Sequence, residues 1–110
     1  MQLEKQKLLE DIRQAAEAID RYTHGKSLED YLGDDQLQAS VERKFEIIGE
    51  ALNRLSRLDP DVAEGIEDCP KIIAFRNTLI HGYSVVDSMV VWDIVKTHLP
   101  RLQTAIQKIL

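Results

Sequence analysis

The chain has 110 residues, enough for one domain of ordinary size, and its 44% hydrophobic and 30% charged residues give a globular composition. A single Cys excludes an intrachain disulfide, and no apolar run approaches the ~20 residues that span a bilayer. The formal net charge of −5 argues against broad, non-specific binding to nucleic acid, but it allows a small basic cleft. Because no apolar signal region marks the N-terminus, we expect a cytoplasmic protein. From its length we expect one domain over residues 1–110.

Hydrophobic residues recur at helical spacing along almost the whole chain, and no strand pattern competes. The first expected helix covers about residues 2–23, and Gly25 is placed to stop it. A short second helix is expected to open at Ser27, because Asp30 three residues later is a capping signal. It ends at Gly33, and its apolar residues are expected to fold back onto the first helix.

The third expected helix starts at Asp34 or Asp35 and ends near Leu58. At 1.5 Å per residue it would be about 36 Å long and would span the domain. Gly49 lies in its middle, where Gly costs roughly 1 kcal/mol against Ala, so we expect another helix to approach closely there. Its apolar stripe has steps of three and four residues: Leu37, Val41, Phe45, Ile48, Leu52 and Leu55.

Two further helices follow a connector at residues 59–70, which has a Pro near each end and room for a short helical turn. The fourth expected helix covers about residues 70–81. The fifth begins at Asp87 or Ser88, and Pro100 should kink it or split it in two. The pattern therefore predicts an all-α bundle of about five helices, with an up-down core, a short helix and a kinked C-terminal helix. The third and fifth helices are apolar on nearly two sides, which favours a partner chain.

The segment FRNTLIHGY places an Arg, an Asn and a His on a helix whose remaining residues are mostly apolar. His81 lies in the last turn, where the helix dipole favours the imidazolium form and suits a group that exchanges protons near neutral pH. Arg76 offers a fixed fork of donors for phosphate, and Asn77 can hold the imidazole or a phosphate oxygen. These are the parts of metal-independent RNA cleavage: a base for the 2′-OH, an acid for the leaving oxygen and a cation for the phosphorane charge.

The spacing within this segment sets a geometric problem. Asn77 and His81 are four residues apart and share one helix face. Arg76 and His81 are five apart, which separates them by roughly 140° around the axis of a straight helix. The reach of the Arg side chain, a frayed helix end or a second copy of the helix across a two-fold axis could bring them together.

The motif Arg76-x4-His81-x-Tyr83 resembles that of the HepT-like branch of HEPN-domain proteins. The segments YTHGKSLEDYL, FEIIGEALNRLS and VDSMVVWDIVKTHLPRLQTAI are similar to the same family, in the same order and at similar spacing. The resemblance covers nearly the whole chain. It departs at the segment DCPK, where many members carry a Trp or another large residue after a Pro, and this difference is expected to alter partner docking more than chemistry.

The resemblance implies a HEPN-type homodimer whose two motifs face each other in a cleft at the dimer interface. It also implies the toxin of a type VII-like toxin–antitoxin pair, a metal-independent endoribonuclease that needs no cofactor and cleaves RNA such as tRNA or mRNA. By position, Arg76 and His81 would be catalytic and Asn77 would support them. Tyr83 would accept AMP from a nucleotidyltransferase (MNT-type) antitoxin, and the added charge and bulk would block the cleft.

Other interpretations of the same residues are open. Arg76 could form a salt bridge to Glu46 or Glu50 while His81 caps its own helix, and Tyr83 could pack against the fifth helix. The dimer could be a catalytically inactive binding module that partners a nucleotidyltransferase. A purely structural dimer would require the Arg-Asn-His cluster to be fully buried and saturated.

No metal site is expected, because no ligand spacing such as HExxH is present and carboxylates on a helix surface are usually solvated or paired. Glu46 and Glu50 should therefore pair with a neighbouring arginine, namely Arg43, Arg54 or Arg76. Three further residues that could suggest chemistry are expected to be buried or half-buried: Phe45, Cys69 and Trp92.

Overall fold

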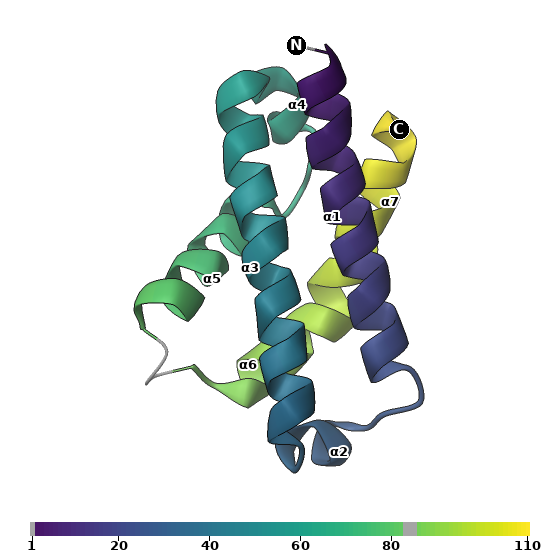
Figure 1. The fold of residues 1–110 in the computed structure, drawn as a ribbon, viewed down its shortest axis with the longest axis vertical. Helices are drawn as coiled ribbons and strands as arrows, with labels where there is room; N and C mark the ends of the chain where they lie inside the picture. Colours follow the sequence, from purple (N-terminus) through teal and green to yellow (C-terminus); the bar gives the residue numbers. More distant parts are fainter. Residues whose placement is uncertain (1, 83–85) are drawn as a thin grey trace.

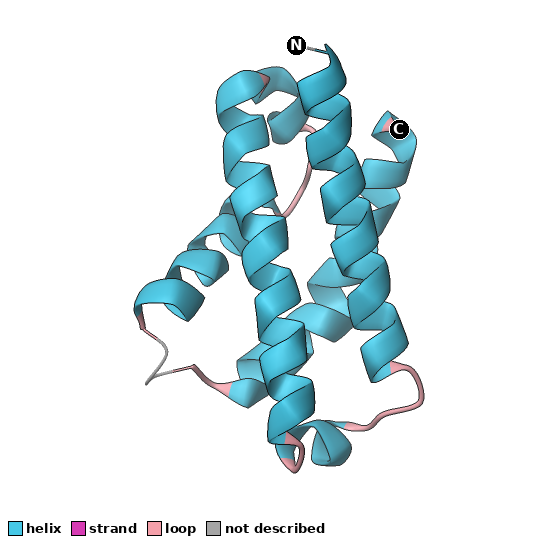
Figure 2. Cartoon of the chain, viewed as in Figure 1, coloured by secondary structure: helices cyan, strands magenta, loops and turns pink. Residues whose placement is uncertain are grey.

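The computed structural model describes residues 2–82 and 86–110, and within these ranges it is helical with no strand (Figure 2). The helices are α1 (Gln2–Thr23), α2 (Leu28–Leu32), α3 (Asp35–Leu58), α4 (Pro60–Glu64), α5 (Cys69–His81), α6 (Ser88–Asp93), the π-helical turn η2 (Ile94–His98) and α7 (Leu99–Ile109). The prediction of an all-α bundle is confirmed. None of the described helices is both long and apolar enough to cross a membrane.

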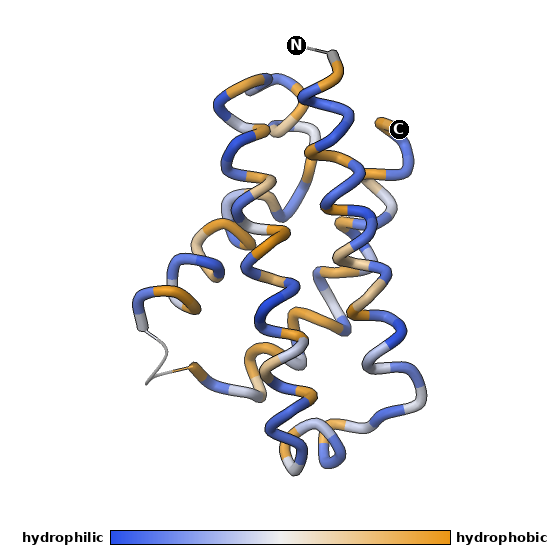
Figure 3. The backbone as a smooth tube through the Cα atoms, in the orientation of Figure 1, coloured by the Kyte–Doolittle hydropathy of each residue, from blue (hydrophilic) through white to orange (hydrophobic). Residues whose placement is uncertain are grey.

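The long helices α1 and α3 run antiparallel and form the centre of the bundle (Figure 1). α5 packs on α3, and α7 packs on α1, so the motif-bearing helix and the C-terminal helix lean on different members of this pair. Hydrophobic and hydrophilic residues alternate along each long helix, as a one-sided packing face requires (Figure 3).

Local signals set the helix ends where the sequence predicts them. Gly25 adopts a φ of +72° after α1, a backbone conformation that other residues rarely adopt. At the start of α2, the N–H of Asp30 donates to the Ser27 hydroxyl, and the N–H of Ser27 donates to the Asp30 carboxylate. This capping box satisfies two N–H groups that a helix start would otherwise leave without partners.

The docking of α2 differs from the sequence prediction. It packs mainly against α3 and α6, and not chiefly against the first helix. Tyr31 is fully buried there, and its ring centroid lies 5.2 Å from that of Trp92. The sequence pattern identifies the apolar face of α2 but not its neighbour, because the contact partner comes from 61 residues further along the chain.

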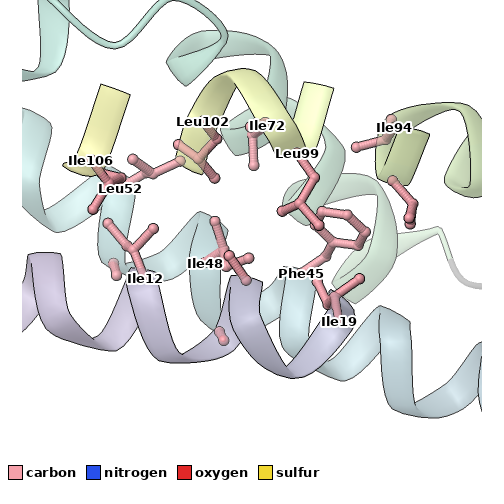
Figure 4. Close-up of a cluster of buried hydrophobic side chains, with 14 of the residues drawn as sticks. Ile12, Ile19, Phe45, Ile48, Leu52, Ile72, Ile94, Leu99, Leu102 and Ile106 are labelled. Atoms are coloured by element: carbon pink, nitrogen blue, oxygen red, sulfur yellow. The ribbon is translucent and has the colours of Figure 1, made fainter. Parts of the chain in front are cut away.

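The predicted apolar stripe of α3 is buried along its whole length, and α3 packs against α1 and α5. Figure 4 shows this core, which includes Ile12, Ile19, Phe45, Ile48, Leu52, Ile72, Ile94, Leu99, Leu102 and Ile106. Phe45 lies edge-on to Phe75, with the ring centroids 5.4 Å apart. This core therefore holds α5 against α3.

The fifth expected helix is interrupted before Pro100, as predicted. In the π turn, the N–H of Leu99 donates to the carbonyl of Ile94, five residues back instead of four. Because Pro100 has no N–H, the α-helical hydrogen bonds to the fourth residue back cannot continue through it. The π turn, with its longer hydrogen bond, stands directly before this interruption. Pro100 then lies in the first turn of α7, where Pro is well tolerated.

Candidate active site

The helix that carries the motif crosses α3 at Gly49. A Cβ built on Gly49 would lie 2.2 Å from the Cβ and 2.7 Å from the Cγ of Arg76, and 3.5 Å from the carbonyl oxygen of Ile72. The close helix approach predicted at Gly49 is therefore confirmed. Because Arg76 fills the space left by the missing side chain, its stem lies directly on α3.

The guanidinium of Arg76 is held by two neighbours. Its Nη1 donates to Oδ1 of Asn77 at 2.8 Å, and its Nη2 donates to the carboxylate of Glu50 on α3. Only 21% of the Arg76 side chain is exposed. Since a guanidinium carries five N–H donors, these two bonds fix its plane and leave donors for a phosphate oxygen.

Glu46 and Glu50 on α3 both pair with arginines, as the sequence predicts. Glu50 accepts from Arg76 and also from Nε of Arg54 at 3.1 Å. Glu46, one turn earlier, accepts from Arg43 at 3.2 Å. Within residues 2–82 and 86–110, no group of three His, Cys, Asp or Glu side chains is arranged to hold a metal ion.

The imidazole lies at the far end of the same helix. His81 is the last residue of α5 and is exposed, and this end of the helix lies at the edge of the molecule (Figure 1). α5 is a continuous α-helix from Cys69 to His81, so the separation of roughly 140° between Arg76 and His81 applies. No hydrogen bond joins the two in the described part of the chain. One copy of the helix therefore brings Arg76 and Asn77 together, but not Arg76 and His81.

Within one chain, the motif is only partly buried and paired, because Arg76 binds Glu50 as the structural interpretation expects. Asn77 and His81 are exposed on the single chain, so a purely structural dimer would have to bury both in its interface. Tyr83 lies outside the described residues. Gly82 ends α5, and its N–H donates to the carbonyl of Thr78 at 2.7 Å.

A groove of about 580 Å³ lies beside the motif, and Asn77 forms part of its wall. Most of the wall is apolar and comes from the connector, α4 and the outer face of α5, including Ala63, Ile66, Pro70, Ile73 and Ala74. Further exposed apolar residues precede and follow residues 83–85 in the sequence: Ile80 is 38% exposed, Met89 57% and Val90 50%.

The expected buried residues lie where predicted. Phe45 is 0%, Cys69 3% and Trp92 8% exposed. Burial raises the pKa of the Cys69 thiol. This keeps it in the unreactive protonated form and agrees with a packing role.

A buried polar cluster at the start of α5 was missed by sequence reasoning. Asp68, the residue before α5, accepts from Nδ1 of His98 at 2.9 Å and lies 3.2 Å from Nε of Arg101. Asp68 and His98 are each 8% exposed. Their separation of 30 residues gives no local signal, and the only hint is an acidic residue directly before a Cys-Pro helix start. The cluster therefore joins the beginning of α5 to η2, through His98, and to α7, through Arg101.

Comparison with known proteins identifies the family. The sequence profile described as Ribonuclease HepT-like matches residues 12–109. "Probable ribonuclease HepT" of Thermococcus cleftensis is 37% identical over 105 residues, covering 92% of this chain and 91% of that protein. "Putative RNase TTE0752" of Caldanaerobacter subterraneus is 32% identical over 104 residues, covering 93% and 90%. No solved structure matches the chain.

A further relative places the same domain in a larger protein. "Gamma-glutamylcyclotransferase and putative RNase MJ0434" of Methanocaldococcus jannaschii is 34% identical over 104 residues, which cover 93% of this chain but 46% of that protein. The chain belongs to the HepT-like ribonuclease family. Its membership, and the names of these relatives, support ribonuclease activity.

Proposed function

We propose that this protein is a metal-independent endoribonuclease that acts as a homodimer and is the toxin of a type VII-like toxin–antitoxin pair. One observation carries the proposal. In a chain of the HepT-like ribonuclease family, α5 presents an anchored guanidinium at Arg76 and an exposed imidazole at His81. These two groups are sufficient in kind for cleavage of an RNA phosphodiester.

The chemistry is an in-line transfer within the RNA. A neutral His81 imidazole takes the proton of a 2′-OH, and the 2′ oxygen bonds to the neighbouring phosphorus. The bond from phosphorus to the 5′ oxygen breaks, and an imidazolium gives that oxygen a proton. Arg76 donates to the phosphorane oxygens while charge builds up on them. The products are a 2′,3′-cyclic phosphate and a 5′-hydroxyl.

The angle between the two groups supports a site made from two copies of the chain. Arg76 is engaged at α3 and His81 points roughly 140° away from it, so a second α5 across a two-fold axis supplies the missing partner. The exposed apolar residues Ile80, Met89 and Val90 are suited to burial in such an interface.

Control of the nuclease is proposed to act at Tyr83, two residues beyond the end of α5. A nucleotidyltransferase antitoxin would transfer AMP from ATP to the phenol oxygen and release pyrophosphate. The added phosphate and nucleoside would place negative charge and bulk close to His81, where RNA must bind. The mass of the protein after incubation with such an enzyme and ATP tests this step.

The runner-up is a dimer without nuclease activity that serves as partner and AMP acceptor of the nucleotidyltransferase. Expression of the parent, of Arg76→Ala and of His81→Ala in a bacterial host separates the two. The nuclease proposal expects growth arrest and RNA fragments with the parent only, while circular dichroism shows all three folded. Growth arrest by all three, or by none, favours the binding module.

A further inference from the structure

Glu50 is the group outside α5 that holds the guanidinium of Arg76 in the described structure. It directly follows Gly49, the residue at which α5 crosses α3. The contact that seats α5 therefore also delivers the carboxylate to the guanidinium. Asn77 binds the other terminal nitrogen, so two of the three guanidinium nitrogens are fixed from different helices.

Glu50 holds Arg76 in place without cancelling the positive charge of the site. Its carboxylate binds Arg76 and also Arg54, so two guanidinium groups share one carboxylate and the cluster keeps a net positive charge. An incoming phosphate would therefore still meet an attractive field. An Arg side chain has many rotamers. A partner that already restricts them reduces the conformational entropy that is lost when the substrate binds.

We propose that Glu50 is a positioning residue for Arg76: it holds the guanidinium in its working orientation before RNA binds and leaves the remaining N–H groups for phosphate. This inference rests on the proposed ribonuclease function. It differs from a simple structural ion pair, because it requires the loss of the carboxylate to slow the chemical step more than it weakens RNA binding.

The chain offers a matched control for the test. Glu46 lies one turn before Glu50 on α3 and pairs with Arg43 instead of Arg76. Glu50→Gln and Glu46→Gln each remove one charge and keep the side-chain shape. We expect Glu50→Gln to lower kcat for RNA cleavage by about tenfold or more with little change in KM, and Glu46→Gln to leave both within about twofold.

A second measurement does not depend on cleavage. The Nε–H resonance of Arg76 in a ¹H–¹⁵N spectrum, assigned by its loss in Arg76→Lys, reports the freedom of the guanidinium. We expect Glu50→Gln to shift and broaden it and Glu46→Gln to leave it unchanged. Thermal unfolding of both variants shows whether the fold is intact.

The outcomes separate the two proposals. A Glu50→Gln variant that cleaves as fast as the parent, or no slower than Glu46→Gln, overturns the role of Glu50. A parent that cleaves no RNA refutes the proposed function, and the resonance then decides the positioning claim alone. An Arg76 resonance that Glu50→Gln leaves unchanged overturns that claim.

Discussion

Gly49 and Arg76 form the close contact between α3 and α5. Gly49 has no side chain, and the aliphatic part of the Arg76 side chain fills the space that this leaves. A Cβ on Gly49 would lie 2.2 Å from the Cβ of Arg76, far inside any normal contact. The helix that carries the motif is therefore placed by a residue on another helix.

Replacing Gly49 with Ala should destabilise the protein. Ala gains roughly 1 kcal/mol of helix propensity, but the clash with Arg76 forces α5 to move, at a cost of about 1–3 kcal/mol for overpacking. Unfolding in urea should show a net loss of stability, and the shift of α5 should also reduce RNA cleavage. Gly33→Ala is the control, because a Cβ there has its nearest neighbour at 3.5 Å. A Gly49→Ala variant as stable and active as the parent would show that the close packing of Arg76 on Gly49 does not position α5.

Two inactive variants should restore activity when they are combined. Arg76→Ala and His81→Ala homodimers are each expected to lose about 10²-fold or more of the cleavage rate. If the site pairs Arg76 of one copy with His81 of the other, a heterodimer of the two variants keeps one intact site. Co-expression with two different tags isolates that heterodimer, which should recover up to about half of the parent rate. A heterodimer as inactive as both homodimers would place each site within one chain.

The buried cluster at the start of α5 should contribute measurably to stability. In Asp68→Asn, His98 and Arg101 lose the carboxylate they share, and removing one partner of a buried ion pair costs on the order of 3 kcal/mol. Glu67→Gln is the matched control: its carboxylate is 68% exposed and lies 3.7 Å from Arg101, so its loss should change the unfolding free energy by less than about 0.5 kcal/mol. Equal effects of the two substitutions would contradict the assignment of the cluster as structural.

Acid should destabilise the fold through paired carboxylates. The hydrogen bond from Arg13 lowers the pKa of Glu10 to about 2, and the hydrogen bond from Lys5 lowers the pKa of Asp59. Both folded values lie below the unfolded ones, about 4.3 for Glu and 3.9 for Asp, so the unfolded state binds more protons between them. This stabilisation is complete above about pH 5 and is lost as the pH falls toward about 2.

Melting temperatures between pH 7 and pH 2.5 test this dependence. They should fall with pH, and less steeply in Asp59→Asn than in the parent. Glu42 acts in the opposite direction, because burial and the charge of Glu46 raise its pKa. Glu42→Gln should therefore raise the melting temperature at neutral pH. A parent whose melting temperature is constant down to pH 3 would contradict the assignment of the lowered pKa values.

The sequence predicts most of the fold because the signals for helices are local. The period of the apolar residues and the capping pair Ser27–Asp30 act within a few residues, and the observed helix ends follow them. Pro100 likewise disrupts its own helix, and the π turn appears directly before it. The neighbours of α2 were not predictable in the same way, because Tyr31 meets Trp92 across most of the chain.

The sequence names the residues of the candidate site but does not reveal their environment. The spacing of Arg76 and His81 already implies that a straight helix points them apart, and the continuous α5 keeps that geometry. Gly49 indicated a close helix approach without identifying Arg76 as the group that fills the space. The choice of Glu50 over Glu46 as the partner of Arg76 depends on where α5 crosses α3, which no local pattern contains.

The central claim is tested most directly by incubating the purified protein with end-labelled tRNA in the presence of EDTA, beside the His81→Ala variant. The account predicts cleavage by the parent alone, with fragments that end in a 2′,3′-cyclic phosphate. Cleavage that EDTA abolishes, or that His81→Ala performs as fast as the parent, would contradict it.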